Sequence, residues 1–229
     1  MWHVEDSPLG RIVVPPDLPP GFAVFSTTRD NPGRIVADEL TRFIHGRFGL
    51  KTSLTTCLQV HSASVVRAAH ESSWRECDSC DALWSSEKGV TLGIKVADCL
   101  PISLIDAEHG VIANVHSGWR GAAQRITAAV LDAAPLDPAS TSAYLGPSIR
   151  ACCFEVGEEV ATRFEERFVE RSRVKPHVDL IAFTIDVLRS RGITKISDSE
   201  LCTRCEGSMF HSYRRDGAGK GRNLVMVSQ

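Results

Sequence analysis

The chain has 229 residues, 43% of them hydrophobic, which is enough for a sizeable packed core and argues against disorder. Its 26 basic and 28 acidic residues leave a net charge of −2, so no global basic field attracts nucleic acid. A small-molecule partner is therefore favoured. The N-terminus lacks the basic and apolar regions of a signal peptide, and no run reaches the roughly 20 apolar residues that span a bilayer. We expect a cytoplasmic protein with no membrane partner.

The apolar pattern predicts a sheet-rich protein with several helices. Strands are predicted over 10–14, 23–26, 54–60, 64–69, 90–96, 100–105, 111–115, 193–196 and 223–227. Helical spacing is found over 36–48, from 119 to before Pro135, over 156–168 and over 178–188. Gly49 and Gly192 can provide the left-handed stops of two of these helices. Because no linker or repeat divides the chain, we expect residues 1–229 to form a single α+β domain.

Eight cysteines occur in a chain without a secretion signal, so we expect them to stay reduced or to bind metal. Two Cys-x-x-Cys pairs, Cys77 with Cys80 and Cys202 with Cys205, have the geometry for a four-thiolate zinc site. The gap between the pairs far exceeds the roughly 15–20 residues of a compact zinc ribbon. The sequence therefore favours one zinc ion over a second, structural one.

Three residues that can bind metal lie where apolar runs end, namely His61, Cys99 and His116. Two imidazoles and one thiolate are a known ligand set for catalytic zinc, with the fourth position left for water or substrate. Their separations of roughly 40 and 20 residues are not diagnostic, so three ordinary buried residues are the alternative interpretation. Asp98 is a candidate acceptor for a ligand imidazole, or a turn cap.

Seven motifs, in a fixed order, resemble those of one family. They are Gln59-Val60-His61, Cys80-Asp81-Ala82-Leu83, Ala97-Asp98-Cys99-Leu100-Pro101, His116-Ser117-Gly118-Trp119-Arg120-Gly121, Leu145-Gly146-Pro147-Ser148-Ile149, Phe154-Glu155-Val156-Gly157 and Ser212-Tyr213-Arg214-Arg215-Asp216-Gly217. The chain resembles the laccase-domain family, whose members are variously named polyphenol oxidase, purine nucleoside phosphorylase and peptidoglycan editing factor. The resemblance runs from Thr27 to Arg222. Cys152, Cys153 and Cys202 also match the family pattern.

The resemblance implies an α/β/β/α sandwich of mixed sheets and a zinc ion held by His61, Cys99 and His116 as metal-binding and catalytic residues. It further implies phosphorolysis of adenosine, inosine or guanosine to the base and ribose 1-phosphate, with adenosine deaminase and methylthioadenosine phosphorylase as related activities. Zinc suits both reactions, because it can lower the pKa of a bound water to about 7 or orient an anionic oxygen. The implied partners are therefore purine nucleosides and phosphate.

Arg120 lies where a helix is expected to begin, and free amides there favour an anion such as phosphate. Arg29, Arg215 and Arg222 are further candidates for substrate binding, with surface ion pairs as the alternative for all four. We interpret Trp119 as a packing residue. Ser62 and Ser117 depart from the family's usual small residues, and the loop over 30–33 after Arg29 is shortened, which affects the substrate wall more than the metal.

Three other functions remain open. A cell-wall precursor hydrolase would use Cys99 as a thiolate nucleophile activated by His116. A copper polyphenol oxidase would require more histidines than one His₂Cys set provides, so zinc is preferred to copper. A non-catalytic, metal-stabilised partner protein would show no turnover. Nothing in the sequence indicates an oligomeric state.

Overall fold

The computed structural model describes residues 1–31, 33–34 and 36–229 and consists mainly of two mixed β-sheets. The seven-stranded sheet has the order β1 (His3–Glu5), β2 (Ile12–Val14), β3 (Ala23–Thr27), β15 (Asn223–Ser228), β8 (Val90–Val96), β4 (Ser53–Cys57) and β6 (Arg75–Cys77). The six-stranded sheet has the order β14 (Lys195–Asp198), β11 (Thr141–Leu145), β9 (Leu100–Asp106), β10 (Val111–Ser117), β7 (Ala82–Ser85) and β5 (Val65–Arg67). Antiparallel pairs dominate both sheets.

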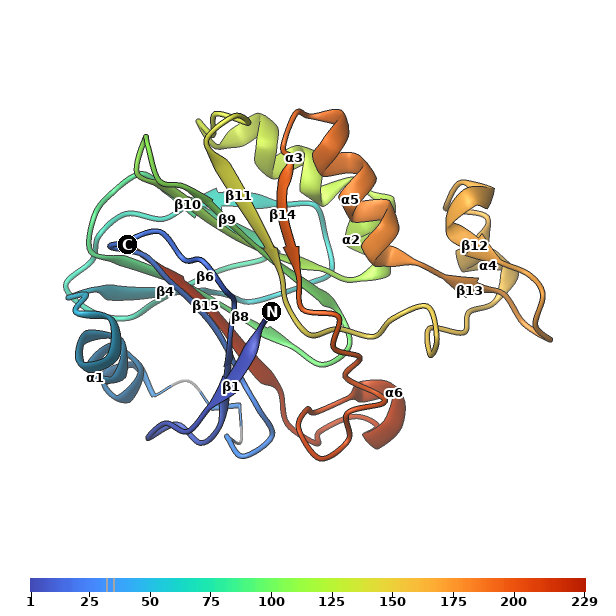
Figure 1. Cartoon of the computed structure of the whole chain (residues 1–229), viewed down its shortest axis with the longest axis horizontal. Coiled ribbons are helices and arrows are strands. Elements are labelled where there is room, and N and C mark those ends of the chain that lie inside the picture. The colour runs from blue at the N-terminus through green and yellow to red at the C-terminus, as the bar shows by residue number, and fades with distance from the viewer. Residues whose placement is uncertain (32, 35) are drawn as a thin grey trace.

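Helices cover the outer faces of the two sheets. Helix α1 (Ala37–Phe48) packs on the seven-stranded sheet, and α3 (Ile126–Ala133) and α5 (Leu180–Ser190) pack on the six-stranded sheet (Figure 1). The layers follow the order α/β/β/α, as the family resemblance predicted. Each helix in the described part of the chain is too short or too polar to cross a membrane.

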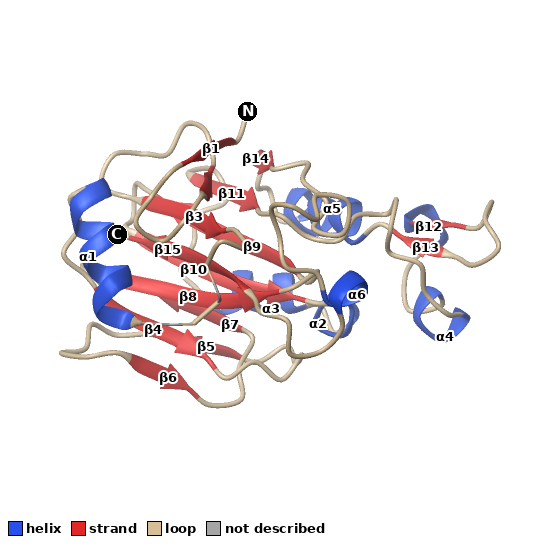
Figure 2. Ribbon diagram, turned by 90° about the horizontal axis from the view of Figure 1, so that it is seen from below, coloured by secondary structure: helices blue, strands red, loops and turns tan. Residues whose placement is uncertain are grey.

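The shorter elements gather near one end of the sheets. They are α2 (Trp119–Ala123), α4 (Glu158–Ala161), the 3₁₀ turn η1 (Glu166–Phe168), β12 (Val169–Glu170), β13 (His177–Val178) and α6 (Tyr213–Asp216). Figure 2 shows that α4, β12 and β13 project away from the sheets, beyond α5. This projecting segment supplies one wall of the cavity described below.

Strand β10 shows how side-chain alternation builds the two inner layers. Ala113 and Val115 pack toward α3 and α5, whereas Ile112 packs between the sheets. Asn114 shares the face of Ile112, and its side-chain amide donates to the carbonyls of Leu92 and Val225 in the other sheet, both at 2.9 Å. These bonds satisfy a fully buried polar group and fix the two sheets against each other.

Most of the predicted elements are present, and α1 is the clearest. Leu40, Phe43 and Ile44 form its buried stripe, and Gly49 ends it with a φ of 74°. The predicted strands over 90–96, 100–105, 111–115 and 223–227 correspond to β8, β9, β10 and β15. The shortened loop after Arg29 includes Pro32, which lies outside the described residues.

Two helix predictions are wrong in extent. The helix expected from residue 119 is split into α2 and α3, because Arg125 between them adopts a left-handed φ of 62°. The helix expected over 156–168 consists only of α4 and the turn η1. Its apolar residues are buried by folding back, with the rings of Phe164 and Phe168 packed edge-on against Phe183. The apolar residues at helical spacing over 156–168 are thus buried without forming a continuous helix.

The start of α5 and several short strands were also mispredicted. Val178 belongs to β13, and the helix begins at Leu180 because the Asp179 side chain accepts the amides of Ile181 and Ala182. The unpredicted strands are β1, β6, β7, β11, β12 and β13. Of these, β7 matters most, because its register positions the candidate site.

Candidate metal centre

Strand register brings three parts of the site together at one edge of the six-stranded sheet. In the antiparallel pair β10–β9, His116 lies opposite Pro101, and in the pair β10–β7, Val115 lies opposite Ala82. The C-terminal end of β10 therefore lies beside the N-terminal ends of β9 and β7. Cys99, immediately before β9, and Asp81, immediately before β7, consequently flank His116.

His61 reaches the same point from the loop after β4, in the other sheet. Gln59 anchors this loop to β8, because its side chain both donates to the Lys95 carbonyl and accepts from the Lys95 amide at 2.8 Å. The Asp81 carboxylate accepts the amides of Val60, His61 and Ser62 at 3.3, 3.0 and 2.6 Å. These bonds hold His61 at a left-handed φ of 61°, which a residue other than glycine adopts only when its surroundings fix it.

The side chains of His61, Cys99 and His116 converge. Each offers a donor atom, and these atoms all lie within 4.8 Å of one another. Cys99 Sγ is 3.9 Å from His61 Nε2. Nδ1 of His116 is bonded to Asp81 Oδ1 at 2.8 Å, which leaves its Nε2 for a metal. The donor set fits a three-ligand zinc site, for which metal–ligand distances of about 2.0–2.3 Å are usual.

The charges at the site prepare Cys99 as a ligand. Burial alone would raise the pKa of the Cys99 thiol, but hydrogen bonds from His116 and His61 lower it to about 6. Burial alone would lower the pKa of His116, but Asp81 and Cys99 raise it to about 9. The pKa of Asp81 lies well below its usual range despite burial, because His116 and Ser62 donate to it. In the absence of metal, Cys99 and His116 thus form a thiolate–imidazolium pair.

Gly118 is required by the packing of the site. A Cβ atom at this position would lie 2.9 Å from Cys99 Sγ and 3.1 Å from His61 Cδ2. The backbone of Gly118 has an ordinary φ of −72°, so no left-handed conformation requires a glycine at this position. The close approach of the two ligand side chains requires it instead.

The ligands form the floor of a cavity of about 910 Å³. Its apolar wall contains Trp119, Ile149, Phe154, Val156 and Val160, partly from the projecting segment. Its cations are Lys95, Arg120, Lys175, Arg214 and Arg222, from five separate parts of the chain. Volume and lining suit a small molecule that combines an apolar ring with an anion.

The fold separates the four candidate substrate arginines. Arg120 lines the cavity, with its guanidinium 4.5 Å from the Trp119 ring. Arg29 lies outside it and donates to the Gly207 carbonyl. Arg215 also lies outside, because its guanidinium is bound by the carbonyls of Thr203 and Phe210 and by Asp216. The fourth candidate, Arg222, lines the cavity, and so does Arg214, which was not a candidate.

Two other expectations require correction. The acceptor for the ligand imidazole is Asp81, and the Asp98 carboxylate instead accepts the Thr203 hydroxyl and the Arg214 amide, both at 2.6 Å. Helix α2 has only five residues, so its dipole adds little to an anion site beside Arg120. Trp119 both packs against the core and lines the cavity.

Sequence reasoning missed Asp81, Gln59 and Arg214 as site residues. Asp81 and Gln59 stand in motifs next to recognised residues, but their roles follow from strand register and a contact between the sheets. Arg214 stands beside the arginine that was chosen.

The eight cysteines are free, and the Cys-x-x-Cys pairs do not meet. Cys77 and Cys80 pack with Cys57 between the sheets, where Cys80 Sγ is 3.1 Å from Cys57 Sγ. Cys202 and Cys205 instead gather with Cys152 and Cys153. The alternative of a zinc ion shared by the two Cys-x-x-Cys pairs is therefore wrong.

Fold and site together define a two-sheet α/β/β/α protein with a candidate His–Cys–His metal centre at one edge. The chain belongs to the family described as multi-copper polyphenol oxidoreductase laccase, whose model matches residues 22–229. This agrees with the family expected from the sequence motifs.

Several relatives of known name or structure are similar to the chain. Adenosine deaminase RL5, from an unknown prokaryotic organism, is 33% identical, with 90% of this chain and 94% of that protein covered. A purine nucleoside phosphorylase of Aquifex aeolicus is 33% identical, with 84% and 89% covered. The crystal structure of Neisseria meningitidis protein NMB0706 superposes with a TM-score of 0.77 at 26% identity, covering 99% of this chain and 98% of that one.

Proposed function

We propose that residues 1–229 act as one zinc-dependent purine nucleoside phosphorylase domain in the cytoplasm. The enzyme would convert adenosine, inosine or guanosine and phosphate into the base and ribose 1-phosphate, with adenosine deaminase and methylthioadenosine phosphorylase as related activities. The observation that carries the proposal is the convergence of His61, Cys99 and His116 on the floor of a 910 Å³ cavity with an apolar wall and several cations. The names of the relatives support it.

The cations nearest the candidate metal centre would bind phosphate. The Arg214 amide donates a hydrogen bond to Asp98, the residue before Cys99. The Arg214 backbone therefore lies close to the ligands. Arg120 follows Trp119 on α2, at the same end of the sheets (Figure 2). Guanidinium groups bind phosphate oxygens through charge-assisted, often bidentate, hydrogen bonds. Arg120 and Arg214 are therefore the proposed phosphate-binding pair.

The apolar wall would hold the purine. Trp119 and Phe154 offer flat ring faces, and aromatic rings pack well on other rings. Glu155 and Glu159 at the rim of this wall can accept hydrogen bonds from amino or hydroxyl groups. This arrangement would place the sugar between the wall and the candidate metal centre.

In phosphorolysis, a phosphate oxygen forms a bond to the sugar carbon C1′ while the bond from C1′ to the base nitrogen breaks. The electron pair of the broken bond moves into the purine, which takes up a proton. Zinc, when bound by His61, Cys99 and His116, would supply Lewis-acid polarisation of an oxygen atom. Arg120 and Arg214 would hold the phosphate charge, and Asp81 would keep the His116 imidazole oriented.

The test is product analysis with the zinc-loaded protein. We expect release of free base from inosine, adenosine or guanosine only in the presence of phosphate, with ribose 1-phosphate as the second product. His61→Ala or Cys99→Ala should lose both bound metal and activity, whereas His45→Ala, at an exposed position on α1, should keep both. Full activity of the Cys99→Ala protein would falsify the proposal.

A second candidate function, an amide hydrolase acting on cell-wall precursors, is favoured by one observation. Asp81 accepts a hydrogen bond from His116, and the neighbouring imidazoles of His116 and His61 lower the pKa of the buried Cys99 thiol to about 6, as a nucleophilic cysteine requires. This reaction would proceed without metal. The Cys99 sulfur would form a bond to the amide carbon while the C–N bond breaks, the amine would leave with a proton from His116, and water would then release the acid from Cys99. Activity of chelator-treated protein with a trapped Cys99 adduct would favour the hydrolase, and an inactive metal-free protein would exclude it.

A further inference from the structure

A second cluster of metal-binding side chains lies apart from the three ligands on the cavity floor. Cys152, Cys153, Cys202 and Cys205 place their sulfur atoms within 4.8 Å of one another. Cys152 Sγ is 3.7 Å from Cys202 Sγ and 3.8 Å from Cys205 Sγ, and Cys153 Sγ is 3.4 Å from Cys205 Sγ. Cys152 and Cys205 are exposed, and the other two are buried.

These sulfur–sulfur separations match those around a zinc ion with four thiolate ligands. Four sulfurs arranged tetrahedrally at about 2.3 Å from a zinc ion are about 3.8 Å apart. A disulfide bond requires about 2.0 Å, and all eight cysteines are free. Four protein ligands leave no open position, which is typical of structural zinc sites.

The backbone holds the two cysteine pairs together without help from the sulfurs. Each pair lies on a tight turn, and the amide of Cys153 donates to the Arg150 carbonyl at 2.8 Å. Ser148 and Cys202 form a parallel β-bridge, and the Thr203 amide donates to the Ser148 carbonyl at 3.0 Å. The Arg150 guanidinium adds two bonds to the Asp198 carboxylate, at 2.9 and 2.7 Å. The four ligands are therefore preorganised.

Positive side chains next to the cluster can offset its charge, because four thiolates around a divalent ion carry a net charge of −2. The pKa of the Arg204 guanidinium is raised, first by its interaction with Cys153. Arg173 donates to the Cys152 carbonyl at 3.2 Å.

We propose that Cys152, Cys153, Cys202 and Cys205 bind a second zinc ion, with a structural role. The Cys202-x-x-Cys205 motif contributes half of this site, as its spacing indicated. Its partner is the adjacent pair Cys152–Cys153, about 50 residues earlier in the sequence, which has no spacing signature of its own.

This second zinc site would stabilise the backbone next to Cys99 at the candidate metal centre. Thr203, between two of the four cysteines, donates its hydroxyl to Asp98, the neighbour of the ligand Cys99. Asp98 has a left-handed φ of 83°, so this bond helps to hold a strained backbone next to the ligand. Loss of the structural zinc would therefore loosen Cys99. The site itself does not depend on the proposed nucleoside chemistry.

Metal analysis of purified variants tests the proposal. Zinc-loaded wild-type protein should contain two zinc ions per chain, and both the His61→Ala/His116→Ala and the Cys202→Ser/Cys205→Ser proteins should contain one. With cobalt in place of zinc, the histidine double variant should show the strong charge-transfer absorption of a four-thiolate site. The matched control Cys57→Ala/Cys80→Ala removes another close cysteine pair and should retain both ions.

A measurement on wild-type protein tests the site without relying on a variant that could fail to fold. Iodoacetamide should modify Cys152 and Cys205 slowly in zinc-loaded protein and rapidly after chelation, as read by peptide mass spectrometry. Rapid modification of these exposed cysteines in zinc-loaded protein would overturn the site. The site would also be overturned if the Cys202→Ser/Cys205→Ser protein bound as much zinc as wild type, or if protein purified in the presence of a thiol reductant contained a disulfide bond within the cluster.

Discussion

The Asp81 carboxylate accepts a hydrogen bond of 2.8 Å from Nδ1 of His116 and also binds the three amides at 60–62. One side chain thus orients one ligand and fixes the backbone of another, although it would not contact the metal. Sequence motifs alone did not assign it this role.

We therefore expect Asp81→Asn to weaken zinc binding at the candidate metal centre by about 10- to 100-fold. An asparagine offers one acceptor oxygen where the site provides several donors, so His116 and the loop carrying His61 lose part of their support. Competition with a chromophoric chelator measures the affinity. An unchanged affinity, in a variant that unfolds like wild type, would contradict this role.

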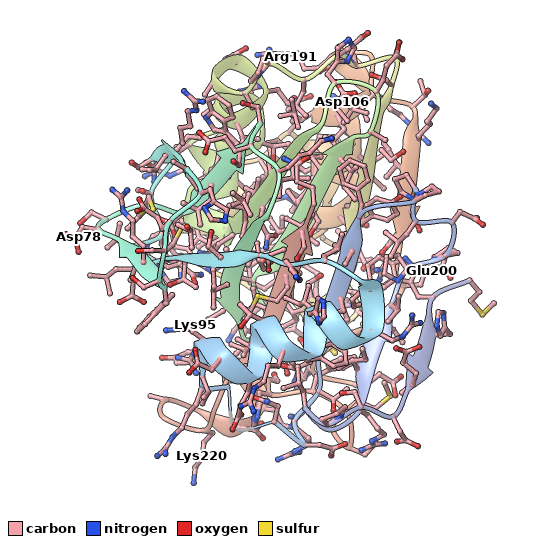
Figure 3. All side chains as sticks on the ribbon, turned by 90° about the vertical axis from the view of Figure 1, so that its left-hand side faces the viewer. Asp78, Lys95, Asp106, Arg191, Glu200 and Lys220 are labelled. Carbon is pink, nitrogen blue, oxygen red and sulfur yellow. The ribbon has the colours of Figure 1, made fainter. Side chains whose placement is uncertain are left out.

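Asp106 provides a matched carboxylate far from the site. Asp106 lies opposite Val111 at one end of the β9–β10 pair, whereas His116 lies opposite Pro101 at the other end. Figure 3 shows Asp106 near the top of the view and the cavity residue Lys95 well below it. Asp106 is fully buried and accepts the Asp137 amide, the Ser140 hydroxyl and the His109 amide at 2.9, 2.7 and 3.2 Å. Asp106→Asn should lower the free energy of unfolding at pH 7 by about 1–3 kcal/mol without changing zinc affinity.

The effect of Asp106 should also depend on pH. Burial alone would raise its pKa, but the hydrogen bonds, first that of the Asp137 amide, lower it. A carboxyl with a lowered folded-state pKa stabilises the protein above its unfolded pKa of about 3.9, and this contribution is lost as the pH falls. The difference between wild type and Asp106→Asn in urea unfolding should shrink at acid pH. A difference that grew on acidification would contradict the assignment.

How far the sequence predicted the site depends on the kind of interaction. His61, Cys99 and His116 could be proposed because residue type and motif identify metal ligands directly. Asp81 could not, because its contact with His116 depends on the pairing of β7 with β10, and β7 was not predicted. Arg215 was chosen over Arg214 because a motif does not show where each guanidinium is held. Arg215 is bound by the Phe210 carbonyl and Asp216 away from the cavity, whereas Arg214 donates to the carbonyl of the cavity residue Glu155.

The same distinction holds for the fold. Helix α1 was predicted because its single buried face sets a helical period. Strand β10 was predicted because a short, β-rich apolar run is typical of a strand that is buried on both faces. The region 156–168 also has helical spacing, but its aromatic residues are buried by contacts with Phe183, more than ten residues later. The spacing of apolar residues indicates that a residue is buried, but it does not indicate which partner it packs against.

Gly118→Ala tests the close packing around the ligands. The added methyl group would lie within 2.9 Å of Cys99 Sγ and 3.1 Å of His61 Cδ2, so both side chains must shift. We expect kcat/KM to fall on the order of tenfold to a hundredfold, because small displacements of reacting groups are costly. Gly46→Ala on α1, where a Cβ meets open space, should retain activity and provides the control. Equal activities in the two variants would show that this close packing is not needed for activity.

The metal-free protein should contain an unusually acidic thiol at Cys99. Its pKa of about 6 means that alkylation of Cys99 should stay fast at pH 7 and slow below pH 6, whereas an ordinary cysteine has a pKa of about 8.5. Removing a hydrogen-bonding partner in His116→Ala should move the midpoint upward. The Cys99 peptide is followed by mass spectrometry, and a wild-type midpoint near that of an ordinary cysteine would show that the pair does not form.

Comparing variants of Arg120 and Arg29 distinguishes phosphate binding in the cavity from a structural contact outside it. Arg120 lines the cavity, so Arg120→Ala should raise the KM for phosphate at least about tenfold, because a hydrogen bond to a charged group contributes about 1.5–3 kcal/mol. Arg29 donates to the Gly207 carbonyl outside the cavity, so Arg29→Ala should leave this KM unchanged. Steady-state kinetics at varied phosphate measures both. A rise for Arg29→Ala alone would restore the original assignment and place phosphate elsewhere.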